Sequence, residues 1–187
     1  MIPDWCTDVS NPRGADLIAV DIVWRDSFKF IFWLPRESSL IESATPLALA
    51  AEQGHTGIVT LLLGRDDVDP DSVDSEGCTP LARAAAMGHE IIVRQLLERS
   101  SVNINSKDKD GYTPLAWAAR RGHTEAVRAL VERRELDKIS RDDDGWTPYG
   151  HAIDEGHEDV AKLLMESLGN MGFEGADGYF LACERML

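Results

Sequence analysis

Apolar residues recur along the middle of the chain in sets with helical spacing. Each set has two adjacent apolar residues and, four positions later, two more, so that all four lie on one stripe of a helix. The sets are Ile58-Val59 with Leu62-Leu63, Ile92-Val93 with Leu96-Leu97, Ala126-Val127 with Leu130-Val131, and Val160-Ala161 with Leu164-Met165. This pattern predicts four amphipathic helices, each with a single buried face.

A second helix is predicted directly before each of these. Thr is suited to cap a helix N-terminus through its hydroxyl, and Pro is tolerated at the first helical position, where no amide partner is lost. Thr-Pro pairs begin at Thr45, Thr79, Thr113 and Thr147, so helices should start at Pro46, Pro80, Pro114 and Pro148. A Gly-His pair follows nine residues after each Thr, and its Gly can take the left-handed conformation that ends a helix.

These landmarks return in phase every 34 residues, from position 45 to 79, 113 and 147. A fixed period of this size is the signature of a stacked array of repeats. One helical hairpin cannot bury its apolar stripe alone, so neighbouring units must pack against each other. Four units satisfy the requirement of about three for a stable core.

The unit resembles the ankyrin repeat, whose pattern is D-x-x-G-x-T-P-L-H-x-A-A-x-x-G-H. The matching segments are 74–89, 108–123 and 142–157, with Val102-Asn103 in a following loop. The resemblance implies an all-α solenoid of helix-turn-helix units with hairpin-like turns and degenerate caps. Departures from the pattern are Ala48, Ala82, Ala116 and Gly150 for the family's His, the missing Asp and Gly of the first unit, and Tyr149 and Ile153 in the fourth.

The repeats should occupy residues 37–167. Residues 1–36 match no repeat, and we expect them to cap the first unit, with a separate interaction element as the alternative. Phe28, Phe30 and Phe32 alternate with other residues there in a way that suits a strand. Residues 168–187 contain Asp177-Gly178-Tyr179 without a Thr-Pro pair, which indicates a degenerate fifth repeat or a helical cap.

Charge and cysteine content narrow the class of partner and compartment. The formal net charge of −14 argues against nucleic-acid binding, although residues 107–136 form a basic belt with seven Lys and Arg against five Asp and Glu. Three cysteines without metal-type spacing favour a reducing intracellular compartment, cytoplasmic or nuclear. Charged residues interrupt the apolar stretch 17–34, so we expect no membrane span, and we expect a monomer.

No catalytic or phosphate-binding motif is present, and we expect no enzyme activity, cofactor or metal. The acidic loop 65–76 lacks the Gly and Glu register of a calcium loop. The histidines of the Gly-His pairs should bond between layers of the array. His151 is the exception, since Asp154 and Glu155 follow it closely and Asp142, Asp143 and Asp144 come shortly before it. A surface histidine beside acids is the expected environment. A metal or catalytic site around His151 is the alternative.

Recognition is therefore the function we expect. By resemblance to ankyrin arrays, the turn tips and the exposed positions of each first helix should form a concave surface that binds a protein partner. Aromatic and Arg side chains dominate the energetics of interfaces, which places the strongest contacts on the third and fourth repeats. The partner-binding residues expected are Arg83, Met87, Lys109, Asp110, Tyr112, Trp117, Arg120, Arg121, Asp143, Asp144, Trp146 and His151.

Two questions stay open at this stage. Tyr112 and Trp146 would contribute nothing to a partner if they pack between neighbouring turns. The chain is also interpretable as part of a larger regulatory protein that contains the same repeats.

Overall fold

The computed structural model describes residues 17–23, 29–35 and 45–169. The chain divides into two compact units, Met1–Glu42 and Ser43–Leu187. In the first unit, β1 (Leu17–Val23) pairs antiparallel with β2 (Lys29–Pro35), in a register that sets Leu17 opposite Pro35 and Val23 opposite Lys29. β2 contains the alternating Phe30 and Phe32, as the sequence pattern predicted for a strand. The predicted capping role of residues 1–36 stays a prediction.

The second unit contains eight helices within residues 45–169, arranged as four consecutive pairs. Within each pair a short helix is followed by a longer one. The helices are α1 (Pro46–Glu52), α2 (Thr56–Leu63), α3 (Pro80–Ala86), α4 (Glu90–Leu97), α5 (Pro114–Arg120), α6 (Thr124–Val131), α7 (Pro148–Asp154) and α8 (Glu158–Gly169). The degenerate fifth repeat or helical cap expected at residues 168–187 lies outside the described residues, except that α8 continues to Gly169.

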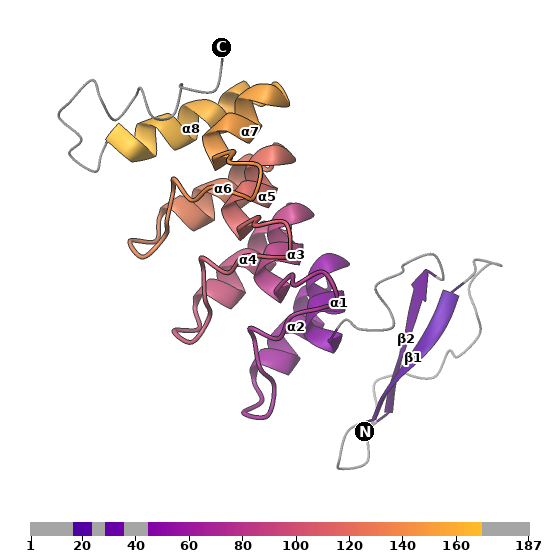
Figure 1. The fold of residues 1–187 in the computed structure, drawn as a ribbon. Coiled ribbons are helices and arrows are strands. Elements are labelled where there is room, and N and C mark those ends of the chain that lie inside the picture. The colour runs from indigo at the N-terminus through magenta and orange to yellow at the C-terminus, as the bar shows by residue number, and fades with distance from the viewer. Residues whose placement is uncertain (1–16, 24–28, 36–44, 170–187) are drawn as a thin grey trace. The chain divides into compact units, whose positions relative to one another are not determined.

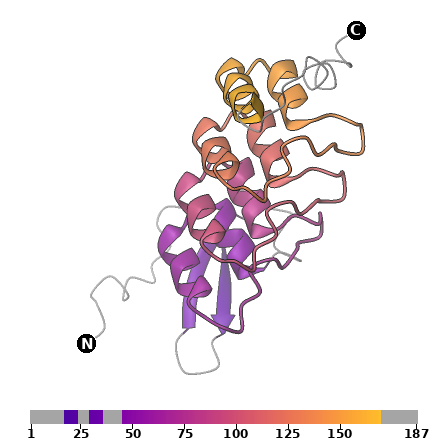
Figure 2. The same cartoon turned by 90° about the vertical axis from the view of Figure 1, so that its left-hand side faces the viewer.

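The pairs stack in two layers (Figures 1 and 2). In one layer α1, α3, α5 and α7 contact each other in order, and in the other α2, α4, α6 and α8 do the same. Each unit therefore packs on its neighbours, as the period of the sequence required. The all-α solenoid of helical hairpins is confirmed for the repeat region.

The Thr-Pro pairs start the short helices as predicted. The Thr113 hydroxyl accepts the amide of Ala116 at 3.2 Å, and Pro114 is the first helical residue. The other three Thr residues do the same for Ala48, Ala82 and Gly150 at 3.1–3.3 Å. Each cap satisfies one of the orphan amides of the first helical turn and so fixes where the helix begins.

The core lies between the two layers. Leu47, Leu81 and Leu115 follow the prolines and are fully buried, and each contributes on the order of 1.5–3 kcal/mol by leaving water. Tyr149 occupies this position in the fourth repeat and is only half-buried. The small residues Ala84 and Ala85, with no exposed surface, allow the short helices to approach each other closely.

The Gly-His pairs join successive repeats. The Nε2 atoms of His89, His123 and His157 bond to the carbonyl oxygens of Glu52, Ala86 and Arg120, at 2.9, 3.0 and 3.1 Å. Each acceptor carbonyl belongs to the last residue of the short helix of the preceding repeat. A carbonyl at this position has no amide of the same helix to accept, and the histidine takes its place. The prediction that these histidines bond between neighbouring repeats is confirmed.

Candidate binding surface

An aspartate shapes the turn before each of α3, α5 and α7. Asp108 Oδ1 accepts the backbone amides of Asp110 and Tyr112 at 3.1 and 2.8 Å. Asp74 and Asp142 hold their turns in the same way, through the amides of Glu76, Cys78 and Trp146. The carboxylates replace the partners that these turn amides lack in the backbone, so the turn conformation depends on them.

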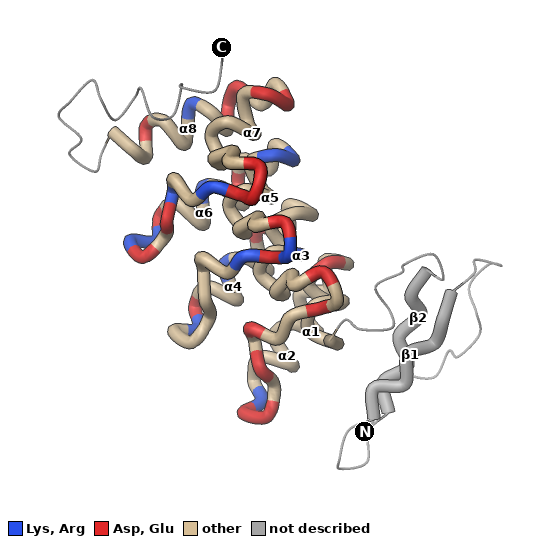
Figure 3. Tube along the Cα trace, in the orientation of Figure 1, with Lys and Arg blue, Asp and Glu red and all other residues tan. Residues whose placement is uncertain are grey.

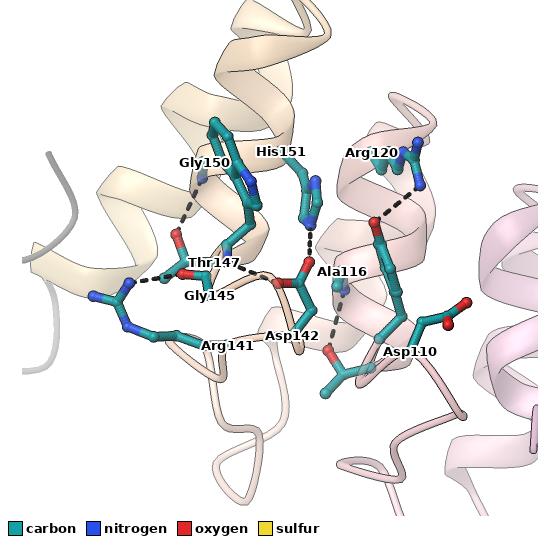
Figure 4. A network of polar contacts seen from close by, with 12 residues as sticks. Asp110, Ala116, Arg120, Arg141, Asp142, Gly145, Thr147, Gly150 and His151 are labelled. Atoms are coloured by element: carbon teal, nitrogen blue, oxygen red, sulfur yellow. Dashed lines mark hydrogen bonds and ion pairs between the residues drawn. The ribbon is translucent and has the colours of Figure 1, made fainter. Parts of the chain in front are cut away.

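The second carboxylate oxygen of each aspartate binds the side chain nine residues later, on the following short helix. Asp74 Oδ2 accepts Arg83 Nε at 2.7 Å, Asp108 Oδ2 accepts Trp117 Nε1 at 2.7 Å, and Asp142 Oδ2 contacts His151 Nε2 at 2.6 Å. Figure 4 shows His151 pointing from α7 to the Asp142 carboxylate. Three different donors thus occupy one structural position, and each has its polar group bound within its own repeat.

Aromatic rings connect the third and fourth repeats. The ring of Tyr112 stacks on Trp117 with a centroid distance of 4.8 Å and on His151 at 5.1 Å, and His151 stacks on Trp146 at 5.9 Å. Arg120 Nη1 donates a hydrogen bond to the Tyr112 hydroxyl at 2.9 Å. Burial raises the pKa of Tyr112, an effect that the positive charge of Arg120 opposes. We call these four rings the aromatic stack.

The aromatic stack corrects two of the predicted binding residues. His151 is 7 % exposed, so the expectation of a surface histidine beside acids is wrong. Tyr112 is 9 % exposed, because it lies between the rings of Trp117 and His151. Both side chains therefore stabilise the junction between repeats and have little surface left for a partner. The reading in which Tyr112 packs between neighbouring turns is the one that holds.

The other predicted residues retain surface. Arg83, Trp117, Arg120 and Trp146 are half-buried, each with part of its side chain in contact with the array. Those that are exposed lie at the turn tips and at the ends of α3 and α5: Met87, Lys109, Asp110, Arg121, Asp143 and Asp144. Neighbouring turns are joined by backbone hydrogen bonds from Lys109 N to Glu76 O and from Asp143 N to Asp110 O, at 3.0 and 3.1 Å. We call the surface formed by the turns and by α1, α3, α5 and α7 the odd-helix face.

Acidic and basic residues both occur along the turns and helix ends of this face (Figure 3). Arg121 is exposed, with its guanidinium 5.8 Å from the centre of the Trp117 ring. Arg120 makes an ion pair with Glu155 at 3.4 Å, and both side chains are more than 40 % exposed. An exposed pair of this kind is worth little, so the charges of both residues stay available to a partner.

The structure brings one of the acids that lie near His151 in the sequence, Asp142, to its imidazole. Asp154 and Glu155 are exposed, whereas His151 points inward to Asp142. Within residues 17–23, 29–35 and 45–169, no cluster of three His, Cys, Asp or Glu side chains could hold a metal ion. Burial raises the pKa of the Cys78 thiol to about 12, which leaves it protonated and a poor nucleophile at neutral pH.

The bond between each turn aspartate and the side chain nine residues later was not predicted from the sequence. The recurrence of Asp74, Asp108 and Asp142 at the same place in each unit was visible in the sequence. Their partners share no side-chain type, however, since Arg, Trp and His have only the N–H donor in common. A pattern search by residue type therefore passes over this contact.

Comparison with known proteins agrees with the repeat architecture. A family model described as ankyrin repeats, which spans three copies, matches residues 25–108 and again residues 92–173. No curated protein matches the chain. Among the described helices, none has the length and apolar character needed to cross a membrane.

Proposed function

Because the chain belongs to the ankyrin-repeat family, whose arrays are generally protein-interaction modules, we propose that it is a scaffold that binds a protein partner through the odd-helix face. Proteins of this family are typically not enzymes, and the proposal includes no catalytic step. The partner would be held mainly by the third and fourth repeats.

One observation carries this proposal: the positions that cap the helices and pack the repeats together recur between units, whereas the exposed positions of the odd-helix face do not. Thr113-Pro114, Ala118-Ala119 and Gly122-His123 have close equivalents in the second repeat at 79–80, 84–85 and 88–89. The tip residues change from Ser75 and Glu76 to Lys109 and Asp110 and then to Asp143 and Asp144. Uniform packing with a changing surface is what a scaffold needs in order to recognise one particular partner.

The half-buried residues add affinity to this surface. The part of Trp117 that is not covered by Tyr112 lies beside the exposed guanidinium of Arg121. Trp and Arg are the side chains most often found to dominate binding energy, particularly when their own rotamers are already fixed. Trp117 is fixed by the bond of its indole to Asp108, so a partner would lose little entropy in ordering it.

Site-specific photo-crosslinking in extracts of the native source tests this function. A photoreactive residue replaces Met87 or Lys109 on the odd-helix face, and a matched control replaces Arg128, which is exposed on α6 in the other layer. We expect the first two variants to capture the same protein and the α6 variant to capture none. Capture by none of the three, or by the α6 variant alone, would contradict the proposed function.

A further inference from the structure

The residue that ends each short helix lies on the surface of the odd-helix face. These residues are the C-caps of α1, α3, α5 and α7, and all are exposed. They occur once per repeat and have different chemistry: an amide, a thioether, a guanidinium and a carboxylate. We call them the recognition row: Gln53, Met87, Arg121 and Glu155.

The position one helical turn earlier cannot serve the same purpose. The residues at that position are Arg83, Trp117 and His151. The polar group of each is already hydrogen-bonded to the turn aspartate of its own repeat. The polar groups of the recognition row are less engaged. Among the described residues Arg121 makes no ion pair, and Glu155 meets only the Arg120 guanidinium, at 3.4 Å. In the third and fourth repeats the row therefore leaves charge available to a partner.

The spacing of the row limits what can lie along it. Neighbouring packed helices have axes roughly 8–10 Å apart, so successive members of the row are separated by about that distance. A β-strand directs residues i and i+3 to opposite sides, although three residues span about 10 Å. A polyproline II helix has three residues per turn and rises about 3.1 Å per residue, so residues i, i+3 and i+6 share one side about 9 Å apart.

The charges select the side chains of the occupant. Met87 is 38 % exposed and offers an apolar contact, Arg121 requires an acidic residue, and Glu155 requires a basic one. A nucleic-acid strand is the other extended anion that Arg120 and Arg121 could attract. Glu155 and the exposed Asp110, Asp143 and Asp144 would repel it, as would the net charge of −14.

We propose that the recognition row binds a polyproline II segment of a protein partner, in which an apolar, an acidic and a basic residue follow each other at every third position. The apolar residue contacts Met87, the acidic residue pairs with Arg121, and the basic residue pairs with Glu155. The proposal rests on the proposed protein-binding function and names the kind of segment that this function recognises.

A charge exchange tests it. A display library of random twelve-residue peptides is selected on the full chain and on the double variant Arg121→Glu with Glu155→Arg. The wild type should enrich an acidic and a basic residue three positions apart. An apolar residue should lie three positions from the acidic one, on the side away from the basic one. The double variant should enrich the same spacing with the charges exchanged. A misfolded variant could not produce this exchange, so the result does not depend on the variant's stability.

Synthetic peptides then give the magnitude. Arg121→Glu should weaken binding of the wild-type consensus peptide by about tenfold or more, and the charge-exchanged peptide should recover most of that loss on the double variant. The control Arg128→Glu, on α6, should leave binding unchanged.

An absence of enrichment, a different spacing, or a consensus that ignores the charge exchange would overturn the proposal. Should photo-crosslinking from the odd-helix face succeed while this selection fails, the array binds a protein in another way and only the recognition row is wrong. Should crosslinking fail as well, the protein-binding function itself is contradicted.

Discussion

Each turn aspartate makes several polar contacts through a single carboxylate. Asp108 accepts two turn amides through one oxygen and the Trp117 indole through the other, and it also lies 3.5 Å from the thiol of Cys78 in the preceding repeat. Its carboxylate therefore links a turn, the helix that follows and the neighbouring repeat. An aspartate that the sequence identified only as part of the repeat pattern is, in the structure, a centre of polar contacts.

Replacing this aspartate should be costly. Asp108→Ala leaves the amide of Tyr112 and the indole of Trp117 without their acceptor in a part-buried environment, and we expect a loss of about 2–3 kcal/mol in the free energy of unfolding. Urea denaturation followed by circular dichroism measures it. Asp110→Ala, two residues away at an exposed position, should change stability by less than about 0.5 kcal/mol. Equal effects of the two substitutions would show that the carboxylate contacts of Asp108 contribute nothing.

At the level of the helix, the sequence predicted correctly where the short helices begin, but it did not predict the contacts between each turn and the helix that follows. Thr113 and Pro114 mark the start of α5 because capping is a local property of consecutive residues. The bond from Asp142 to His151 depends on how a turn folds back over a helix, which no local pattern encodes. The same reason explains why His151, beside Asp154 and Glu155 in sequence, was expected on the surface and is buried.

The helix-ending glycines have a second role that the sequence did not reveal. Gly88 has a φ of 72°, which favours glycine, as its position before His89 predicted. A Cβ at Gly88 would also lie 2.5 Å from Nδ1 of His123 in the next repeat. That ring is held by its bond to Ala86 O and cannot move away without breaking the contact between layers. Gly88 therefore ends one helix and makes room for the histidine of the next layer.

Gly156 supplies a matched control for this second role. Its φ of 76° is similar, but no atom of the described residues lies within 4 Å of the Cβ that would be added. Gly156→Ala should cost only the left-handed backbone strain, about 1–2 kcal/mol. Gly88→Ala should cost at least about 1 kcal/mol more, because the methyl group displaces His123. Chemical denaturation of both variants measures the difference, and identical losses would show that His123 adapts freely to the methyl group.

On the scale of the whole molecule, stability comes from contacts between neighbouring repeats. The histidines of the Gly-His pairs join each described repeat to the next in the same way. Backbone bonds between turns join the second repeat to the third and the third to the fourth, and the aromatic stack adds a connection specific to the third and fourth repeats. Trp117 and Trp146 of the proposed binding surface are consequently held by contacts within the array before any partner arrives. Rigid presentation lowers the entropic cost of binding, which suits a recognition surface.

The architecture was predictable from the sequence because a 34-residue period states both the unit and its stacking. Exposure of the residues in the proposed binding surface was predictable only in part. Arg121 and Met87 were identified and are exposed, whereas Tyr112 and His151 were identified by residue type and are buried in the aromatic stack. Whether an aromatic residue contacts a partner or its own neighbour is decided by tertiary packing, on which periodicity carries no information.

A rival surface exists on the other layer. Leu61 on α2 and Ile91 on α4 are 61 % and 62 % exposed, more than the apolar residues of the odd-helix face. Apolar side chains that are exposed singly are common and need no partner. Only a direct measurement of where the partner lies can decide between the two faces.

NMR chemical-shift mapping of the isotopically labelled chain with the protein captured by crosslinking is that measurement. Our account predicts that addition of the partner shifts the resonances of Met87, Lys109 and Arg121, and leaves those of Leu61 and Ile91 unchanged. Shifts confined to α2, α4 and α6, with the resonances of the odd-helix face unmoved, would contradict it.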